Sequence, residues 1–165
     1  MKIVIIGGVA GGASAAARLR RLNEKAQIIL LERSGFISYA NCGLPYYIGG
    51  AIQDAEELTL QTPESFWDRF QVEARVGHEV LSIDRETKSV TVRQLSTGKT
   101  YTETYDKLIL SPGAKPFRPN LTGIDSEKIY TLRTVEDTLR IRKAAVDAGC
   151  KAAVVVGGGF IGVET

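Results

Sequence analysis

The sequence predicts an α/β fold built on a parallel sheet, because short runs rich in β-branched residues alternate with an alanine-rich helical segment. Lys2 to Ile6 is an apolar run that stops at glycine, and an alanine-rich stretch with arginines extends from Gly12 to Leu22. Gln27 to Leu31 is a second apolar run. A strand, a helix and a strand in this order form a right-handed crossover, so ligands are expected at the carboxyl ends of the strands.

The middle of the chain predicts a small antiparallel sheet. Residues 79–84, 89–95 and 99–105 show alternating or β-branched patterns, and polar turn residues separate them at 86–88 and 96–98. Short alternating runs joined by such turns are typical of hairpins. We therefore predict a three-stranded antiparallel meander.

Two further helices are expected to begin at threonine caps. Thr62 is followed by proline, which is favoured at the first helical position, and this helix is predicted to reach about Phe70. Thr134 has Asp137 three residues later, a capping-box spacing, and the second helix is predicted to continue to Ala148 before a glycine.

Two more apolar runs are predicted to be buried strands. They are Lys107 to Leu110 and Ala152 to Val156, and each runs into a glycine-containing turn. The turn after the first is expected to face the ligand. Because the sequence stops shortly after the second, we expect it to be a piece of a longer protein.

The composition excludes several classes of function. The 165 residues are 44% hydrophobic and carry a net charge of +2, from 21 basic and 19 acidic residues. No strong field results, so nothing in the composition predicts a nucleic acid or membrane partner. The apolar run at the start is too short for a signal peptide, and we expect a cytoplasmic protein.

Cysteine and histidine are scarce. Cys42 and Cys150 are the two cysteines and His78 is the one histidine. A structural disulfide is not expected in a reducing compartment, and a metal site built from clustered histidine and cysteine ligands has too few candidates. Cys150 and His78 are interpreted as structural residues.

A glycine-rich run follows the first predicted strand and reads Gly7-Gly8-Val9-Ala10-Gly11-Gly12. In a dinucleotide-binding turn, Gly7 permits the tight bend, Gly12 lets helix and strand approach, and the helix amino end binds the pyrophosphate. Glu32, at the end of the next strand, can accept both ribose hydroxyls. Val9 replaces the middle glycine, which should push the phosphates outward or alter the backbone. The alternative is a glycine-rich turn in some other α/β sheet.

A second run has the complete G-x-G-x-x-G pattern, with Gly157, Gly159 and Gly162 after an apolar run. Two such motifs, one domain length apart, most simply hold two dinucleotides and pass electrons between them. Flavin first and nicotinamide second is the usual order in two-dinucleotide flavoproteins. We therefore expect Rossmann-like binding of FAD, and then of NADH or NADPH. The alternative for the second run is a buried glycine turn.

Three further stretches carry a resemblance to a known family. They are Asn41-Cys42-Gly43-Leu44-Pro45-Tyr46, residues 105–114 and Leu132-Arg133-Thr134-Val135-Glu136-Asp137. Together with the first glycine-rich run, the sequence resembles the coenzyme A-disulfide reductases, within the pyridine nucleotide-disulfide oxidoreductase superfamily, over its whole length. The resemblance implies a homodimeric full-length enzyme in which NAD(P)H reduces FAD, and FAD reduces a disulfide held by Cys42.

Cys42 is the expected catalytic residue. Pro45 can begin a helix whose amino end stabilises a thiolate at Cys42, whereas the alternative is an inert buried cysteine. Tyr47 occupies the position of the second cysteine in dithiol relatives, so the oxidised partner is either a substrate thiol or an oxygen. Ala10 stands where peroxide-reducing and oxygen-reducing relatives carry a histidine, which favours the mixed disulfide.

Other site residues are carried over from the family by position. Coenzyme A contacts are implied for Ser14, Arg18, Arg21, Ser38 and Asn41. For the arginine pair the alternative is a solvated helix face. Cofactor contacts are implied for Gly7, Val9, Ala10, Gly11, Gly12, Glu32, Arg33, Val80, Ser111, Pro112, Gly113, Gly157, Gly159 and Gly162.

These observations together predict a doubly wound FAD-binding domain over residues 1–113. Residues 114–150 are expected to form a connector and helix, and residues 151–165 the beginning of a Rossmann-like NAD(P)-binding domain. Three alternatives stay open: a persulfide or polysulfide reductase, an NADH oxidase or peroxidase, and an inactive nucleotide-binding module.

Overall fold

The computed structural model describes residues 1–147 and 149–165, so the predicted helix end at Ala148 lies outside the described residues. The chain forms two compact units. The first comprises Met1–Tyr39 with Thr59–Gly113, and the second comprises Ala40–Leu58 with Ala114–Thr165. The predicted domain boundaries at 113 and 150 stay predictions.

The first unit contains a four-stranded parallel sheet. Its strands are β1 (Lys2–Ile6), β2 (Gln27–Glu32), β3 (Glu73–Val76) and β7 (Lys107–Leu110), in the spatial order β3-β2-β1-β7. Each neighbouring pair is parallel. The predicted α/β fold with a parallel sheet is confirmed, but the sequence analysis missed β3.

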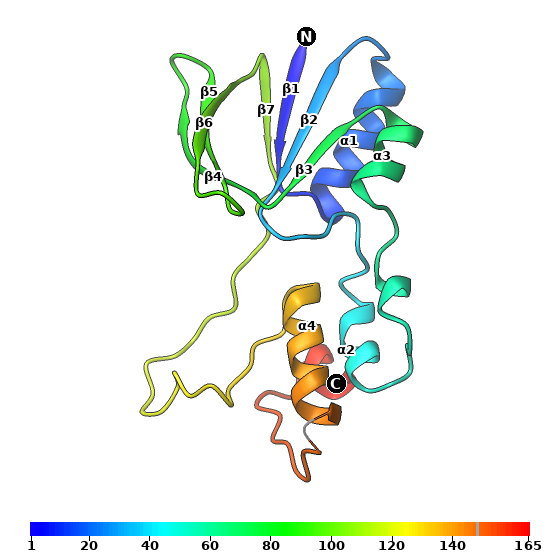
Figure 1. The fold of residues 1–165 in the computed structure, drawn as a ribbon, viewed down its shortest axis with the longest axis vertical. Coiled ribbons are helices and arrows are strands. Elements are labelled where there is room, and N and C mark those ends of the chain that lie inside the picture. The colour runs from blue at the N-terminus through cyan, green and yellow to red at the C-terminus, as the bar shows by residue number, and fades with distance from the viewer. Residues whose placement is uncertain (148) are drawn as a thin grey trace. The chain divides into compact units, whose positions relative to one another are not determined.

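The parallel sheet is covered on both faces (Figure 1). Helices α1 (Ala10–Leu22) and α3 (Pro63–Phe70) pack on the face that carries Ile3 and Ile5 of β1. Val4, whose side chain points the opposite way, belongs to the cluster on the other face. Burial on both faces explains why the first strands read as continuous apolar runs rather than as alternating patterns.

The second face of the parallel sheet is covered by an antiparallel meander. Its strands are β4 (His78–Asp84), β5 (Ser89–Gln94) and β6 (Thr100–Thr104). Val90 and Val92 of β5 are fully buried against the parallel strands. The predicted meander is confirmed, with bounds that differ by a residue at some ends.

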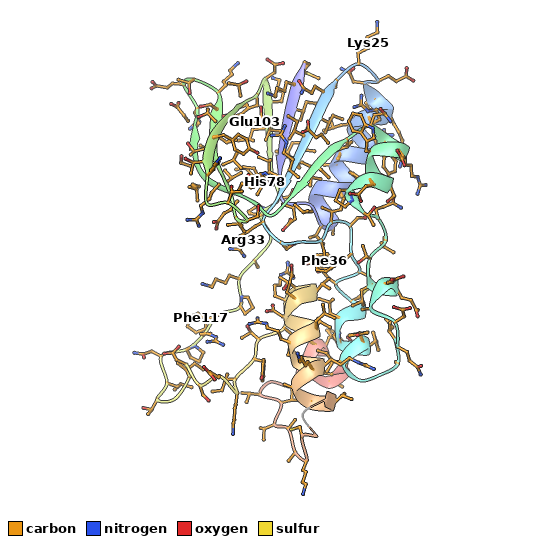
Figure 2. All side chains as sticks on the ribbon, in the orientation of Figure 1. Lys25, Arg33, Phe36, His78, Glu103 and Phe117 are labelled. Carbon is orange, nitrogen blue, oxygen red and sulfur yellow. The ribbon has the colours of Figure 1, made fainter. Side chains whose placement is uncertain are left out.

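Glu103 joins the meander to the parallel sheet through buried charges (Figure 2). Its carboxylate accepts hydrogen bonds from Lys2 Nζ on β1 and, at 2.6 Å, from Arg75 Nη1 on β3. Arg75 also donates to Glu73 at 2.7 Å and to the Tyr101 hydroxyl at 3.1 Å. Charged residues therefore bind strands from both sheets to each other.

The helix caps follow the sequence. The Thr62 side chain accepts from the backbone N–H of Ser65, and the Thr134 side chain accepts from that of Asp137. Both predicted threonine caps are thus confirmed. The second of these helices, α4 (Val135–Arg142), continues as a π-helical segment over Lys143–Asp147, so the predicted helix is present over the described residues. A glycine in the left-handed region follows at 149, as is common where helices end.

The second unit is mainly helical. It contains α2 (Gly43–Ile48), a 3-10 turn at Ala55–Leu58, α4 and α5 (Phe160–Glu164). Helices α2 and α4 lie side by side (Figure 1).

The predicted strand at 152–156 is wrong for this structure. These residues have no regular secondary structure, and Val154 and Val156 are 89% and 96% exposed. A strand needs a neighbour to accept and donate its backbone hydrogen bonds, and the described residues place none beside it. Its apolar side chains consequently stay exposed.

None of the helices in the described part of the chain has both the length and the apolar content needed to cross a membrane.

Candidate functional site

The turn between β1 and α1 leaves no room for side chains at two glycines. Gly7 has φ +97°, and a Cβ there would lie 1.9 Å from the carbonyl oxygen of Ser111. A Cβ at Gly12 would lie 1.7 Å from the carbonyl oxygen of Gly7. The tight bend and the close approach of helix and strand, which the spacing predicted, are both present.

The amino end of α1 is suited to an anion. Within the described residues it has no side-chain cap and no acidic residue in its first turn, whereas α3 and α4 each have a threonine cap. Free N–H groups and the helix dipole favour a phosphate at such an end. Val9 adopts φ −96° and ψ −140°, while Gly159 in the second motif is extended. This is the altered backbone expected where valine replaces glycine.

Glu32 binds the first glycine-rich turn. Its Oε2 accepts from the Gly8 N–H and its Oε1 accepts from the Ser34 N–H, both at 2.7 Å. Each carboxylate oxygen has a second lone pair, so both can still accept from a ribose hydroxyl. The carboxylate therefore holds the ends of β1 and β2 together and still has room for a ligand.

Gly8 is a site residue that the sequence analysis left out. Besides donating to Glu32, it accepts from the backbone N–H of Ser38 at 2.8 Å. A Cβ at Gly8 would lie 2.7 Å from Leu30 Cδ2 and 2.8 Å from Ile37 Cγ2. The sequence signal that could have identified Gly8 is the pair of adjacent glycines at 7 and 8, because the G-x-G-x-x-G pattern does not require a glycine at the second position.

The remaining cofactor candidates of the first unit lie near the ends of its strands. Ser111 follows β7, donates its N–H to Ile6 at 2.8 Å and packs on Gly7, and Gly113 has φ +70°. Arg33 lies after β2, with its guanidinium 3.9 Å from Glu79 of β4. Val80 packs against the core cluster between the two sheets. The turn Ser111–Gly113 is the part that directly contacts the glycine-rich turn.

The second glycine-rich motif repeats the first one locally. Gly157 has φ +113°, and a Cβ at Gly162 would lie 2.1 Å from the carbonyl oxygen of Gly157. The first motif has the same two constraints, a positive φ at Gly7 and a Cβ collision of Gly12 with the Gly7 carbonyl oxygen. Gly159 precedes the first residue of α5.

Three candidate substrate residues are exposed on α1. Ser14, Arg18 and Arg21 are spaced so that they share one face of the helix. Among the described residues, no carboxylate pairs with either arginine. Arg20, between them, instead donates to the backbone carbonyls of Asn23, Glu24, Phe70 and Gln71. Among the three arginines of α1, Arg20 is structural, and Arg18 and Arg21 are available to a ligand.

Cys42 is exposed and precedes the first residue of α2. The expectation that Pro45 begins this helix is wrong, because α2 begins at Gly43 and Pro45 is its third residue. The alternative of a buried cysteine is also wrong. The side-chain oxygen of the neighbouring Asn41 is buried and has no hydrogen-bond partner among the described residues. A buried acceptor without a donor is costly, and a bound ligand could supply the donor.

Tyr46, four residues after Cys42, has a carboxylate partner. Its hydroxyl donates to Glu164 Oε1 at 3.1 Å. This hydrogen bond, together with the negative charge of Glu164, raises the pKa of Tyr46 above its ordinary value of 10.0. The phenol is therefore held in its protonated form.

The described residues contain no group of three or more histidine, cysteine, aspartate or glutamate side chains placed to hold a metal ion. The chemistry indicated by the geometry is that of an exposed thiol and glycine-rich turns.

Comparison with known proteins identifies the family. The model of the family described as pyridine nucleotide-disulphide oxidoreductase matches residues 1–165. The chain belongs to this family. The resemblance inferred from the sequence is thus confirmed.

Individual relatives are similar along nearly the whole chain. Coenzyme A disulfide reductase of Staphylococcus epidermidis is 42% identical over 163 residues, which are 99% of this chain and 36% of the relative. The structure of reduced CoADR-RHD from Bacillus anthracis is 53% identical, with a TM-score of 0.96, and the match covers 99% of this chain and 29% of that one. A NAD-dependent persulfide reductase from A. fulgidus is 33% identical, with a TM-score of 0.93 and coverages of 99% and 31%. The chain therefore spans about a third of its relatives' length.

Proposed function

We propose that this chain is the flavin-binding and thiol-carrying part of an NAD(P)H-dependent disulfide reductase whose substrate is coenzyme A disulfide. The observation that carries the proposal is Cys42, an exposed thiol at the start of α2, next to the unpartnered side-chain oxygen of Asn41. The name of the S. epidermidis relative supports coenzyme A as the thiol.

The first glycine-rich turn fits FAD. The uncapped amino end of α1 would bind the pyrophosphate, and the carboxylate of Glu32 would accept from the ribose hydroxyls. Gly7, Gly11 and Gly12 keep side chains away from the phosphates. Ser111–Gly113 would bound the site on the β7 side, with Arg33 and Val80 nearer the adenosine. When bound, FAD would transfer electrons from NAD(P)H to the disulfide.

The second glycine-rich turn supports NADH or NADPH as the electron donor. Gly157, Gly159 and Gly162 have the complete pattern and the local geometry of the first motif. We assign residues 1–113 to the FAD domain, 114–150 to a connector and helix, and 151–165 to the start of the nicotinamide domain. Dimerisation of the full-length enzyme and a cytoplasmic location belong to the same proposal.

Cys42 carries out the thiol chemistry. Its thiolate attacks one sulfur of the substrate disulfide, so that the mixed disulfide forms and one coenzyme A leaves as a thiolate. Two electrons then cleave the mixed disulfide, which regenerates the Cys42 thiolate and releases the second coenzyme A after it takes up a proton. Cys42 acts without a second cysteine, because Tyr47 occupies the position at which dithiol enzymes carry one.

Substrate recognition is assigned to residues with unused polar groups. Arg18 and Arg21 offer guanidinium groups to the phosphates of coenzyme A, and Ser14 adds a hydroxyl on the same helix face. In the second unit, Asn41 offers its side-chain oxygen to an amide N–H of the substrate tail. Ser38 is the fifth residue that we assign to recognition of coenzyme A.

Mass spectrometry of the natural, unreduced protein tests the proposal. We expect an adduct with the mass of coenzyme A on the Cys42 peptide, and its loss after incubation with NADH or NADPH. A Cys42→Ser variant should lack the adduct and the turnover of coenzyme A disulfide. Cys150→Ser is the matched control, because Cys150 is also exposed and should carry no part of the reaction.

Other outcomes lead to other functions. A singly oxygenated Cys42 would overturn the proposal and favour an NADH oxidase or peroxidase. Reduction of persulfides, with no turnover of coenzyme A disulfide, would favour the activity named for the A. fulgidus relative. Failure of the protein to bind added FAD would overturn the proposed flavin-dependent activity, whereas FAD binding without turnover would support the inactive nucleotide-binding module.

A further inference from the structure

Arg142 contacts Tyr47 in two ways within the second unit. Its Nη1 donates a hydrogen bond to the backbone carbonyl of Tyr47. Its guanidinium carbon lies 4.5 Å from the centroid of the Tyr47 ring. Arg142 is the last residue of α4, and Tyr47 is in the last turn of α2. One side chain therefore binds both the backbone and the ring of a residue in the helix that follows Cys42.

The contact suits the end of α2 at which it lies. The last carbonyls of a helix lack partners inside it and carry partial negative charge, so a cation is favoured there. Three of these carbonyls already accept from the chain after the helix: Pro45 from Gly49 at 2.9 Å, Tyr46 from Ile52 at 3.1 Å, and Tyr47 from Gly50 at 3.3 Å. Arg142 adds a charged donor and a planar group that can lie on an aromatic ring.

Helix α2 needs such support because it has only six residues. A helix this short is unstable by itself and takes its position from its neighbours. At the cysteine end, its position is set by the buried residues Gly43 and Leu44. A Cβ at Gly43 would lie 3.2 Å from Leu58 and 3.3 Å from Ile52, so the fit there is tight. At the other end, Arg142 fixes Tyr47.

We propose that Arg142 is a positioning residue for Cys42, which it orients by holding α2 through Tyr47. This inference rests on the proposed redox role of Cys42. Arg142 does not itself touch the sulfur. It limits the tilt of a short helix, and a thiolate whose direction of attack is fixed reacts faster than one that moves.

The test compares Arg142→Gln with Arg140→Gln in the natural, flavin-loaded protein. Arg140 lies on the same helix, is 69% exposed and pairs with Asp137 on its own helix. We expect Arg142→Gln to lower kcat for disulfide reduction roughly tenfold with little change in KM for NAD(P)H, and Arg140→Gln to leave both unchanged. Arg142→Lys should recover part of kcat, because an ammonium can reach the carbonyl but cannot lie flat on the ring.

A second readout requires no turnover. The reduced proteins are alkylated with iodoacetamide across a pH series, and the modification of the Cys42 and Cys150 peptides is followed separately. Cys150, also exposed, is the internal reference. Arg142→Gln should change the rate and pH profile of Cys42 relative to Cys150, whereas Tyr47→Phe, which keeps both ring and carbonyl, should not.

The two readouts separate the inference from the proposed function. If the parent protein does not turn over coenzyme A disulfide, the proposed function fails, and the alkylation profiles still test Arg142. If Arg142→Gln matches Arg140→Gln in both readouts, with the same melting temperature and flavin spectrum, Arg142 does not position Cys42. A loss of melting temperature with unchanged Cys42 alkylation would also overturn the inference, because Arg142 would then be merely structural.

Discussion

The backbone around Gly12 leaves no room for a side chain. A Cβ there would lie 1.7 Å from the backbone oxygen of Gly7, which cannot move without opening the turn. At the neighbouring Gly11, a Cβ would lie 3.2 Å from the Ser111 hydroxyl, which can rotate away. The two adjacent glycines therefore differ in what they allow, although they belong to the same motif.

We predict that Gly12→Ala lowers the free energy of unfolding by about 3 kcal/mol or more. Gly11→Ala, in the same helical turn, should change it by less than about 1 kcal/mol, since alanine favours the helix and the contact is mild. Urea denaturation of the two variants measures the difference. Equal destabilisation would show that the approach of Gly12 to Gly7 is not the constraint that the structure indicates.

The hydroxyl of Tyr46 provides a pH prediction at the residue scale. Its hydrogen bond to Glu164 stabilises the phenol, and the carboxylate repels a phenolate, so the pKa of Tyr46 is raised above 10.0. Glu164→Gln should lower this pKa toward the ordinary value, because the amide carries no charge. An NMR titration of the labelled tyrosine ring carbon measures it. An unchanged titration midpoint would mean that Glu164 does not contact Tyr46 in solution.

Local sequence rules predicted the candidate site where backbone alone determines the geometry. The glycine spacing was sufficient for Gly7 and Gly12, and the exposed thiol at Cys42 agrees with its place in a loop before a helix. Contacts between residues distant in sequence, such as Arg142 with Tyr47, carry no local pattern and could not be predicted. The start of α2 at Gly43 was missed because Pro45 was taken as the first helical residue, whereas it is the third residue of the helix and still lies in its first turn.

At the scale of elements, β3 shows why the prediction of strands was incomplete. Its residues, Glu73 to Val76, alternate charged and apolar side chains over only four positions, a pattern also found in loops. The charge of Arg75 is explained by a distant partner, which no local pattern reveals. Arg75 pairs with Glu103 on the meander, and Glu73 pairs with Arg75. The meander itself was predicted because hairpin strands and their turns are local in sequence.

The buried carboxylate of Glu103 should hold the meander onto the parallel sheet. We predict that Glu103→Gln lowers the free energy of unfolding by about 3 kcal/mol, because Lys2 and Arg75 would lose their charged partner. Glu79→Gln is the control, since its Arg93 partner is 45% exposed and such pairs contribute about 1 kcal/mol or less. Equal effects in urea denaturation at neutral pH would contradict the role of Glu103.

The same carboxylate gives a pH dependence. Burial opposes its ionisation, but hydrogen bonds from Lys2 and Arg75 outweigh this and lower the pKa of Glu103 below 4.5. The folded protein thus binds the proton less tightly than the unfolded chain, so the stabilisation is present above pH 4.5 and is lost as the pH falls through the lower folded value. Unfolding measured between pH 3 and pH 7 should show a steeper acid loss in the parent protein than in Glu103→Gln.

At the scale of the whole molecule, the chain has one well-packed unit and a second unit with exposed apolar residues. The first unit buries side chains on both faces of its parallel sheet. In the second, Val154, Val156 and Phe160 are each more than four-fifths exposed, which is unusual for apolar side chains so close together in sequence. The sequence predicted a buried strand over residues 152–156 because this run is apolar and rich in β-branched residues. The described residues place no pairing strand beside it, and the strand does not form.

Hydrogen exchange tests this explanation. In the 165-residue chain, the amides of residues 152–156 have no strand partner, so we expect them to exchange at nearly the rate of an unfolded peptide, while those of β1 exchange slowly. In a protein of the relatives' length, we expect the same amides to be protected at least about a hundredfold, because further strands can pair with them. Fast exchange in both forms would mean that residues 152–156 are not a strand, and it would leave the glycine-rich motif as the support for a nicotinamide domain that starts at residue 151.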